Sequence, residues 1–101
     1  MVQTDYVEDQ GALQAVDYVE DTGDSVERAI VILGASNEAE GIAAEYEFLR
    51  RRFGEPGADW QMKRQSLISL GDKHYDQMEI EMADGSEKTI YFDVTSFFGV
   101  P

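Results

Sequence analysis

The stretch VERAIVILGASNEAEGIAAEYEFLRRRF, residues 26–53, decides the fold. Its first part, Val26–Leu33, carries a continuous apolar run rich in β-branched residues, which indicates a strand buried on both faces or central in a sheet. Gly34 follows and breaks this run. A helix is predicted over Asn37–Phe53, because its first residue can cap the helix and Glu40 stands three residues later, as in a capping box.

One side of this helix is expected to face the core. Apolar residues recur along it at intervals of 4, 3 and 4, which is the spacing of one helical stripe: Ile42, Tyr46, Leu49 and Phe53, with Ala39 and Ala43 beside them. Phe48 points nearly opposite this stripe, since each residue turns the helix by about 100°. We therefore expect Phe48 on the outer face of the helix, where it offers a second contact.

Three further strands are predicted from alternating apolar and polar residues, a pattern typical of half-buried antiparallel strands: Trp60–Leu70, Lys73–Ala83 and Glu87–Thr95. Gly71 and Asp72 mark the first turn between them. For the second turn we predict a three-residue loop, Ala83–Gly85, with Gly85 in the left-handed region. This loop length keeps the apolar residues of both strands on one face.

The strand over residues 60–70 is irregular, because Arg64 and Ser66 fall on the same side as Met62. We expect a bulge or a sheet edge there. The C-terminal residues are too apolar to remain in solvent, so Phe97 or Phe98 should close the end of the core.

The order β-α-β-β-β predicts an α+β fold of two layers, a four-stranded and mostly antiparallel sheet with one helix packed on one face. This single domain should span residues 25–101, with its strand order left open. Residues 1–24 combine low hydrophobicity with charge of one sign, which predicts an acidic and flexible arm.

The net charge of the chain restricts the classes of molecule that it can bind. The formal net charge is −13, and the first 27 residues hold eight acidic and no basic side chains. Such a surface repels phosphate backbones and anionic lipids, so we expect no direct nucleic-acid binding and no membrane contact. A protein partner is expected, with charge favouring a basic one. The chain has no cysteine and begins without a signal-peptide pattern, so we expect a cytoplasmic protein. Its oligomeric state stays open: we favour a monomer, and an open edge of the sheet would allow a homodimer.

The arm contains a duplication, DYVEDQG at residues 5–11 and DYVEDTG at residues 17–23. Three interpretations stay open. The copies can be short linear motifs with Tyr-Val anchors (Tyr6, Val7, Tyr18 and Val19) that give avidity for a grooved partner. One copy can instead add a strand to the sheet edge, or pack near Tyr91 or Phe48. The third interpretation is a solubilising tail without a partner.

The outer face of the predicted sheet offers a further contact surface. Leu67, Tyr75 and Tyr91 are expected to form an apolar island among polar side chains there. Contiguous apolar patches of this kind mark contact sites, whereas scattered exposed apolar residues do not. Together with Phe48 and the Tyr-Val anchors, these residues form our predicted partner-binding set.

Catalytic signals are weak in this chain. His74 is the only histidine, and Asp72 and Asp76 flank it at two-residue spacing, a set that could hold a divalent metal or act as an acid and base. A polar hairpin end is the favoured interpretation. The sequence holds no GxGxxG, GKS/T or GxSxG motif. We therefore expect no catalytic residue, no metal and no cofactor.

The sequence thus predicts a non-enzymatic protein-interaction module. One alternative is an acidic protein that mimics nucleic acid, as an inhibitor or an antitoxin-like protein, because −13 is a large charge for a small chain. A second alternative is a small ligand-binding or enzymatic domain that uses His74.

Overall fold

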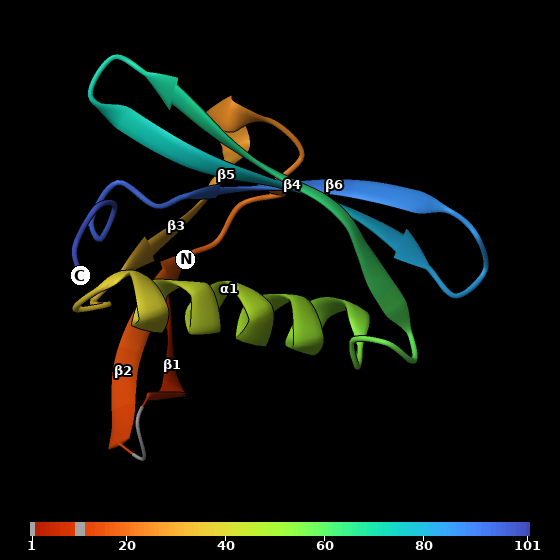
Figure 1. The fold of residues 1–101 in the computed structure, drawn as a ribbon, viewed down its shortest axis with the longest axis horizontal. Helices are drawn as coiled ribbons and strands as arrows, with labels where there is room; N and C mark the ends of the chain where they lie inside the picture. Colours follow the sequence, from red (N-terminus) through yellow and green to blue (C-terminus); the bar gives the residue numbers. More distant parts are fainter. Residues whose placement is uncertain (1, 10–11) are drawn as a thin grey trace.

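The computed structural model describes residues 2–9 and 12–101 (Figure 1). Its elements are, in chain order, β1 (Val2–Asp9), β2 (Ala12–Val19), the short 3₁₀ helix η1 (Val26–Arg28), β3 (Ile30–Leu33), α1 (Glu38–Phe53), β4 (Trp60–Leu70), β5 (Lys73–Met82) and β6 (Glu87–Asp93).

The strands form one sheet in the order β1-β2-β3-β6-β5-β4. The β1-β2-β3 and β4-β5-β6 groups are each antiparallel, and the parallel pair of β3 and β6 joins them. Figure 1 shows α1 between the β1–β2 hairpin and the strands β4, β5 and β6. The expected α+β class with one helix is confirmed. The sheet is mixed and has six strands instead of four, because the N-terminal segment adds two.

This N-terminal segment differs most from the expectation. Its described residues form β1 and β2 of the sheet, and β2 pairs antiparallel with β3. Val16 and Tyr18 of β2 are buried in the core. The arrangement goes beyond the interpretation in which one copy of the repeat adds a strand or packs near Phe48, because residues of both copies lie in strands and Tyr18 of the second copy also packs on Phe48. Flexibility of residues 1–24 on the ps–ns scale stays a prediction, which backbone relaxation measures.

The two copies of the repeat have different environments. Tyr18 lies on β2, inside the sheet, and is 1% exposed, whereas Tyr6 lies on the edge strand β1 and is 62% exposed. The Tyr18 hydroxyl donates a hydrogen bond to the Ala44 carbonyl oxygen at 2.8 Å. Its ring lies 5.4 Å from that of Phe48, between centroids. Only the second copy therefore contributes its tyrosine to the core.

The expectation for the helix face is wrong for Phe48, Ile42 and Tyr46, whereas Leu49 is buried as expected and Ala43 and Phe53 pack against the core. Phe48 is buried, and the buried face consists of Gly41, Ala44, Glu45, Phe48 and Leu49, while Ile42 and Tyr46 are exposed. The physical reason is the aromatic packing of Phe48 between Tyr18 and Phe92, whose ring centroids lie 5.4 and 5.6 Å away. Tyr18, which supplies one side of this packing, lies on β2, a strand that the predicted four-stranded sheet did not include.

Local signals are confirmed at several places. Asn37 caps α1 through its side chain, which accepts a hydrogen bond from the Glu40 amide at 2.9 Å. The β5–β6 loop has the expected three residues, because Met82 N–H donates to the Ser86 carbonyl oxygen at 2.7 Å. Gly85 in this loop has φ 89°, in the left-handed region.

The expected irregularity in β4 is also confirmed. β4 is an edge strand whose register with β5 shifts between Met62 and Arg64.

This shift contradicts our prediction for the outer face of the sheet. After the shift, Leu67 pairs with Asp76, and both residues lie on the helix-facing side of the sheet. Ile68 pairs with Tyr75 instead. Leu67 therefore does not form an island with Tyr75 and Tyr91.

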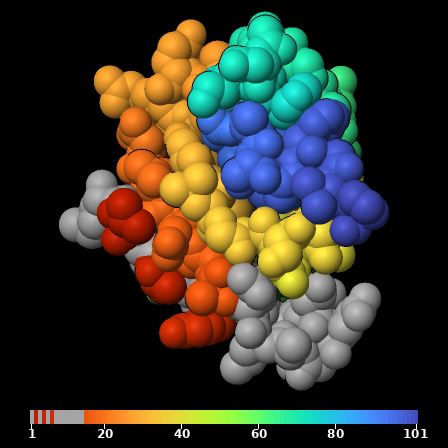
Figure 2. All heavy atoms as spheres, turned by 90° about the vertical axis from the view of Figure 1, so that its left-hand side faces the viewer, coloured from red at the N-terminus to blue at the C-terminus, as the bar shows by residue number. Residues whose placement is uncertain are grey.

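The C-terminal segment packs on the start of α1. The buried Phe97 ring lies so close to Gly41 that a Cβ at this position would collide with it. The Glu38 amide donates to the Val100 carbonyl oxygen at 2.9 Å, and the Gly99 amide donates to Glu38 Oε1 at 3.0 Å. Figure 2 shows the blue C-terminal residues between the turquoise β4–β5 turn and the yellow start of α1. Closure of the core by Phe97 is confirmed.

The repeat offers a matched pair of substitutions. Tyr18→Ala should lower the free energy of unfolding by about 3–5 kcal/mol, because it removes a buried aromatic ring and leaves a cavity. Tyr6→Ala should change it by no more than about 0.5 kcal/mol, the range for exposed positions. Urea denaturation of both variants measures the difference, and equal losses would contradict the placement of β2 in the core.

Candidate functional site

A groove opens between the N-terminal half of α1 and strands β4 and β5, with a volume of about 210 Å³. Its apolar walls are formed by Ile42, Leu67, Val94, Phe97 and Phe98. Glu38, Gln65 and Asp76 provide the polar groups that line it. We call this hollow the α1–β4 groove.

Three structural features create the groove. The orientation of α1 leaves Ile42 44% exposed at the side of the helix. The register shift in β4 turns Leu67, which is 51% exposed, toward the helix side of the sheet. The C-terminal segment then adds Phe98, which is 39% exposed. Large apolar side chains from three distant parts of the sequence thus meet at one hollow.

His74 supports the Phe98 wall. The two rings are stacked with their centroids 3.9 Å apart, and His74 Nδ1 shares a hydrogen bond of 2.8 Å with the Ser69 hydroxyl. Within the described part of the chain, no group of three or more His, Asp or Glu side chains could hold a metal ion. The structure therefore joins His74 to Ser69 and Phe98, and not to the flanking pair of aspartates in a metal cluster.

A buried carboxyl lies beside the groove. Glu45 is fully buried, and burial raises its pKa well above the ordinary value, with a further increase from the carboxyl of Asp76. Among the described residues, no N–H or hydroxyl group donates to the carboxyl oxygens of Glu45. Its hydrogen-bond partner is the carboxyl of Asp76, and two carboxyls can share a hydrogen bond only when one of them holds the proton.

The helix geometry relates Glu45 to the groove. Glu38, Ile42 and Glu45 stand at i, i+4 and i+7 and so form one stripe of α1. Glu38 and Ile42 line the groove. Glu45 is the next residue of the stripe and is buried between the helix and the sheet. From the sheet, Asp76 lines the same groove and interacts with the carboxyl of Glu45.

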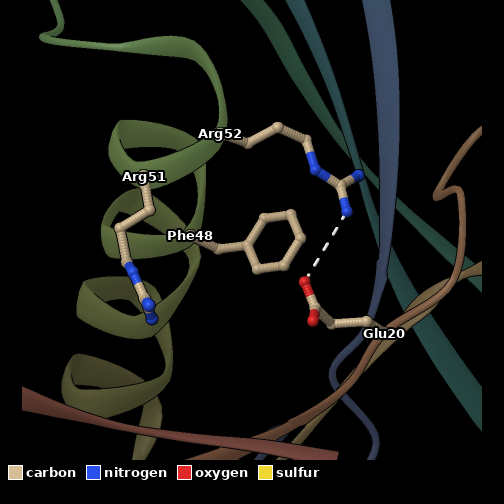
Figure 3. A pocket seen from close by; sticks show the side chains of 4 residues that line it. All are labelled: Glu20, Phe48, Arg51 and Arg52. Carbon is tan, nitrogen blue, oxygen red and sulfur yellow. Dashed lines mark ion pairs between the residues drawn. The ribbon is translucent and has the colours of Figure 1, made fainter. Parts of the chain in front are cut away.

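A second hollow, of about 220 Å³, is lined by Glu20, Phe48, Arg51 and Arg52 (Figure 3). The Arg52 guanidinium lies 4.5 Å from the centre of the Phe48 ring and pairs with Glu20 at 3.7 Å. It also donates to the Thr22 carbonyl oxygen at 3.3 Å. These contacts fasten the segment after β2 to the end of α1, so we interpret this hollow as part of the scaffold.

The predicted contact residues are not brought together. Tyr18 and Phe48 are buried, and Phe48 reaches the surface where it lines the second hollow. The others lie apart: Tyr6 exposed on β1, Val19 half-buried on β2, Tyr75 and Tyr91 half-buried on the outer sheet face, and Leu67 in the groove. The side chain of Val7 lies outside the described residues. The binding roles of the accessible members stay predictions.

Ile42, Phe98 and Glu45 were missed as site residues. The stripe pattern assigned Ile42 to the core, and the apolar tail assigned Phe98 to core closure. For Glu45, the one available signal was its spacing from Phe48. Residues three apart share one face of a helix, so a buried Phe48 implies a buried Glu45.

Comparisons of this chain with protein-family models, with curated proteins and with solved structures find no significant match. Over the residues that the structure describes, no helix has the length and apolarity needed to cross a membrane.

The raised pKa of Glu45 predicts a pH-dependent substitution. The unfolded chain keeps the ordinary carboxyl pKa, so above that pH folding must take up a proton, and stability falls as pH rises toward the folded pKa. Glu45→Gln removes this cost. It should raise the free energy of unfolding at pH 7 by on the order of 1 kcal/mol, with the gain vanishing near pH 4.

Urea denaturation at the two pH values measures this effect. Glu47→Gln is the matched control on the same helix. Glu47 forms an ion pair with Arg50, so removing the Glu47 charge should not stabilise the protein. A Glu45→Gln variant that is less stable than the original chain at pH 7 would show that the carboxylate is ionised and satisfied.

Proposed function

We propose that the protein is a non-enzymatic protein-interaction module whose α1–β4 groove receives an apolar anchor from a basic protein partner. The observation that carries this proposal is the gathering of Ile42, Leu67 and Phe98, all more than a third exposed, around one hollow. Exposed apolar groups that are contiguous and surrounded by polar residues are typical of contact sites.

The size of the groove favours a side chain over a metabolite. Sites for small molecules and cofactors typically enclose about 300–1,000 Å³ and bury most of their ligand. The α1–β4 groove holds about 210 Å³ and is open to solvent. One anchoring side chain suits this volume better than a larger ligand does.

Charge favours a basic partner. The chain carries −13, and the charged side chains that line the groove, Glu38 and Asp76, are both acidic. Complementary charge accelerates association and selects against acidic partners. The cytoplasmic location and the monomeric state are further parts of the proposal. Neither the nucleic-acid mimic nor the domain using His74 gains a specific observation in its favour.

Short peptides test the proposal. A peptide with a central Leu and Lys flanks should bind and shift the amide NMR signals of Ile42, Leu67 and Phe98. Leu67→Gln should weaken this binding at least about tenfold, because a polar group replaces part of the apolar wall. Leu33→Gln is the matched control, since Leu33 is exposed on β3 and its neighbour Ile32 faces the core.

Two comparison peptides complete this experiment. A peptide with an Ala centre should bind more weakly, because it lacks the anchor, and a peptide with Glu flanks should not bind. Binding that is equal for the Leu and Ala peptides, or equally weakened by Leu67→Gln and Leu33→Gln, would contradict the groove as the contact site.

A further inference from the structure

We propose that the basic partner enters the α1–β4 groove as an extended segment that adds an antiparallel strand to the open edge of β4. Backbone hydrogen bonds to residues 65–69 hold this segment, and its apolar anchor points into the groove beside Leu67. The inference rests on the proposed function, because it names the conformation in which the partner occupies the same groove.

One half of the β4 edge lacks the features that usually protect a sheet edge. β4 is the last strand of the sheet, and along residues 61–70 it pairs, within the described part of the chain, with β5 alone. Its first half is protected by a bridge between Pro56 and Trp60, by the register shift, and by the charges of Lys63 and Arg64. Residues 65–70 read QSLISL, without a charged residue or a proline. An uncharged edge of this kind is a template for pairing with another chain.

The hydrogen bonds of β5 show which backbone groups of β4 face the open edge. The Val94 amide donates to the His74 carbonyl oxygen at 2.9 Å, so the backbone of His74 is directed away from β4. Backbone groups alternate along a strand, so those of Tyr75 are directed to β4 and bond to its partner Ile68. By the same alternation, three residues of β4 direct their backbone N–H and C=O groups to the open edge: Gln65, Leu67 and Ser69.

The residues with free backbone groups also form the sheet side of the groove. Gln65 and Leu67 both line it. Residues that stand opposite each other in an antiparallel pair have their side chains on the same face. A residue opposite Leu67 therefore exchanges two backbone hydrogen bonds with it and directs its own side chain to the walls formed by Ile42 and Phe98. In recognition by strand addition, main-chain hydrogen bonds give affinity and pockets for alternate side chains give specificity.

The charges at the site favour a basic segment over a second copy of the chain. Glu38 and Asp76 line the groove, while Lys63 and Arg64 are compensated by glutamates of β5 at 3.9 and 2.9 Å. A second copy carries −13 and is repelled by the same surface. Because side chains alternate along a strand, lysines two positions from the anchor face the groove carboxylates, whereas lysines next to the anchor face away.

Amide hydrogen exchange on the full chain tests strand addition. The probe is a capped peptide with a central Leu, a Thr on each side of it, and a Lys at the next position on each side. In the free chain, the amides of Gln65 and Leu67 should exchange faster than those of Ser66 and Ile68, which bond to β5. Saturating peptide should slow the exchange of Gln65 and Leu67 at least about tenfold and change that of Ser66 and Ile68 less.

Three matched peptides sharpen the result. N-methylation of the central Leu removes the N–H that donates to the Leu67 carbonyl oxygen, so binding should weaken at least about tenfold. N-methylation of the following Thr should weaken it little, because that N–H points away from β4. A peptide of the same composition with its Lys and Thr positions exchanged should bind more weakly than the probe, since its lysines face away from Glu38 and Asp76.

The outcomes separate the two proposals. If the probe peptide leaves the amide signals of Ile42, Leu67 and Phe98 unchanged, the groove of the proposed function fails, and strand addition fails with it. If the signals shift while exchange at Gln65 and Leu67 stays the same and both methylated peptides bind equally, strand addition is overturned and the apolar groove stands. Slower exchange at Gln65 and Leu67 on raising the protein concentration, without peptide, would show a second copy on the edge and overturn the proposed occupant.

Discussion

The packing of the Phe48 ring between Tyr18 and Phe92 is the contact on which the rest of the structure depends. Tyr18 belongs to β2 and Phe92 to β6, so the helix residue bridges the two antiparallel halves of the sheet on either side of the single parallel pair. Burying one such ring contributes about 1.5–3 kcal/mol, and edge or tilted aromatic pairs add to it. The hydrogen bond from Tyr18 to Ala44 fastens the same turn of the helix.

This packing fixes the rotation of α1, and the groove follows from that rotation. With Phe48 turned to the sheet, Glu45 is buried three residues before it, and Ile42 is left at the side of the helix. The shifted register of β4 supplies Leu67 to the facing wall. The same interaction that stabilises the fold therefore leaves an apolar surface exposed and buries a carboxyl whose pKa is raised by burial and by the neighbouring Asp76.

Sequence reasoning succeeded where the determinant was local. The capped start of α1, the loop at Gly85 and the irregularity of β4 each depend on residues within a few positions, and each was predictable. It failed where the determinant was distant. The stripe through Ile42 and Tyr46 is a sound helical pattern, but the face that a helix buries depends on what the sheet offers. Here the sheet includes Tyr18, from a segment whose composition predicted an arm. The groove combines residues from α1, β4 and the C-terminal segment, which no local pattern relates.

The most direct test of this account is a nuclear Overhauser measurement on the aromatic rings in solution. The account predicts strong contacts from the Phe48 ring protons to both Tyr18 and Phe92, and none from Ile42 to the ring of Tyr18. Contacts of Ile42 and Tyr46 with the inner face of the sheet, with the Phe48 ring free of Tyr18, would contradict it, since the helix would then be turned the other way and the groove would close.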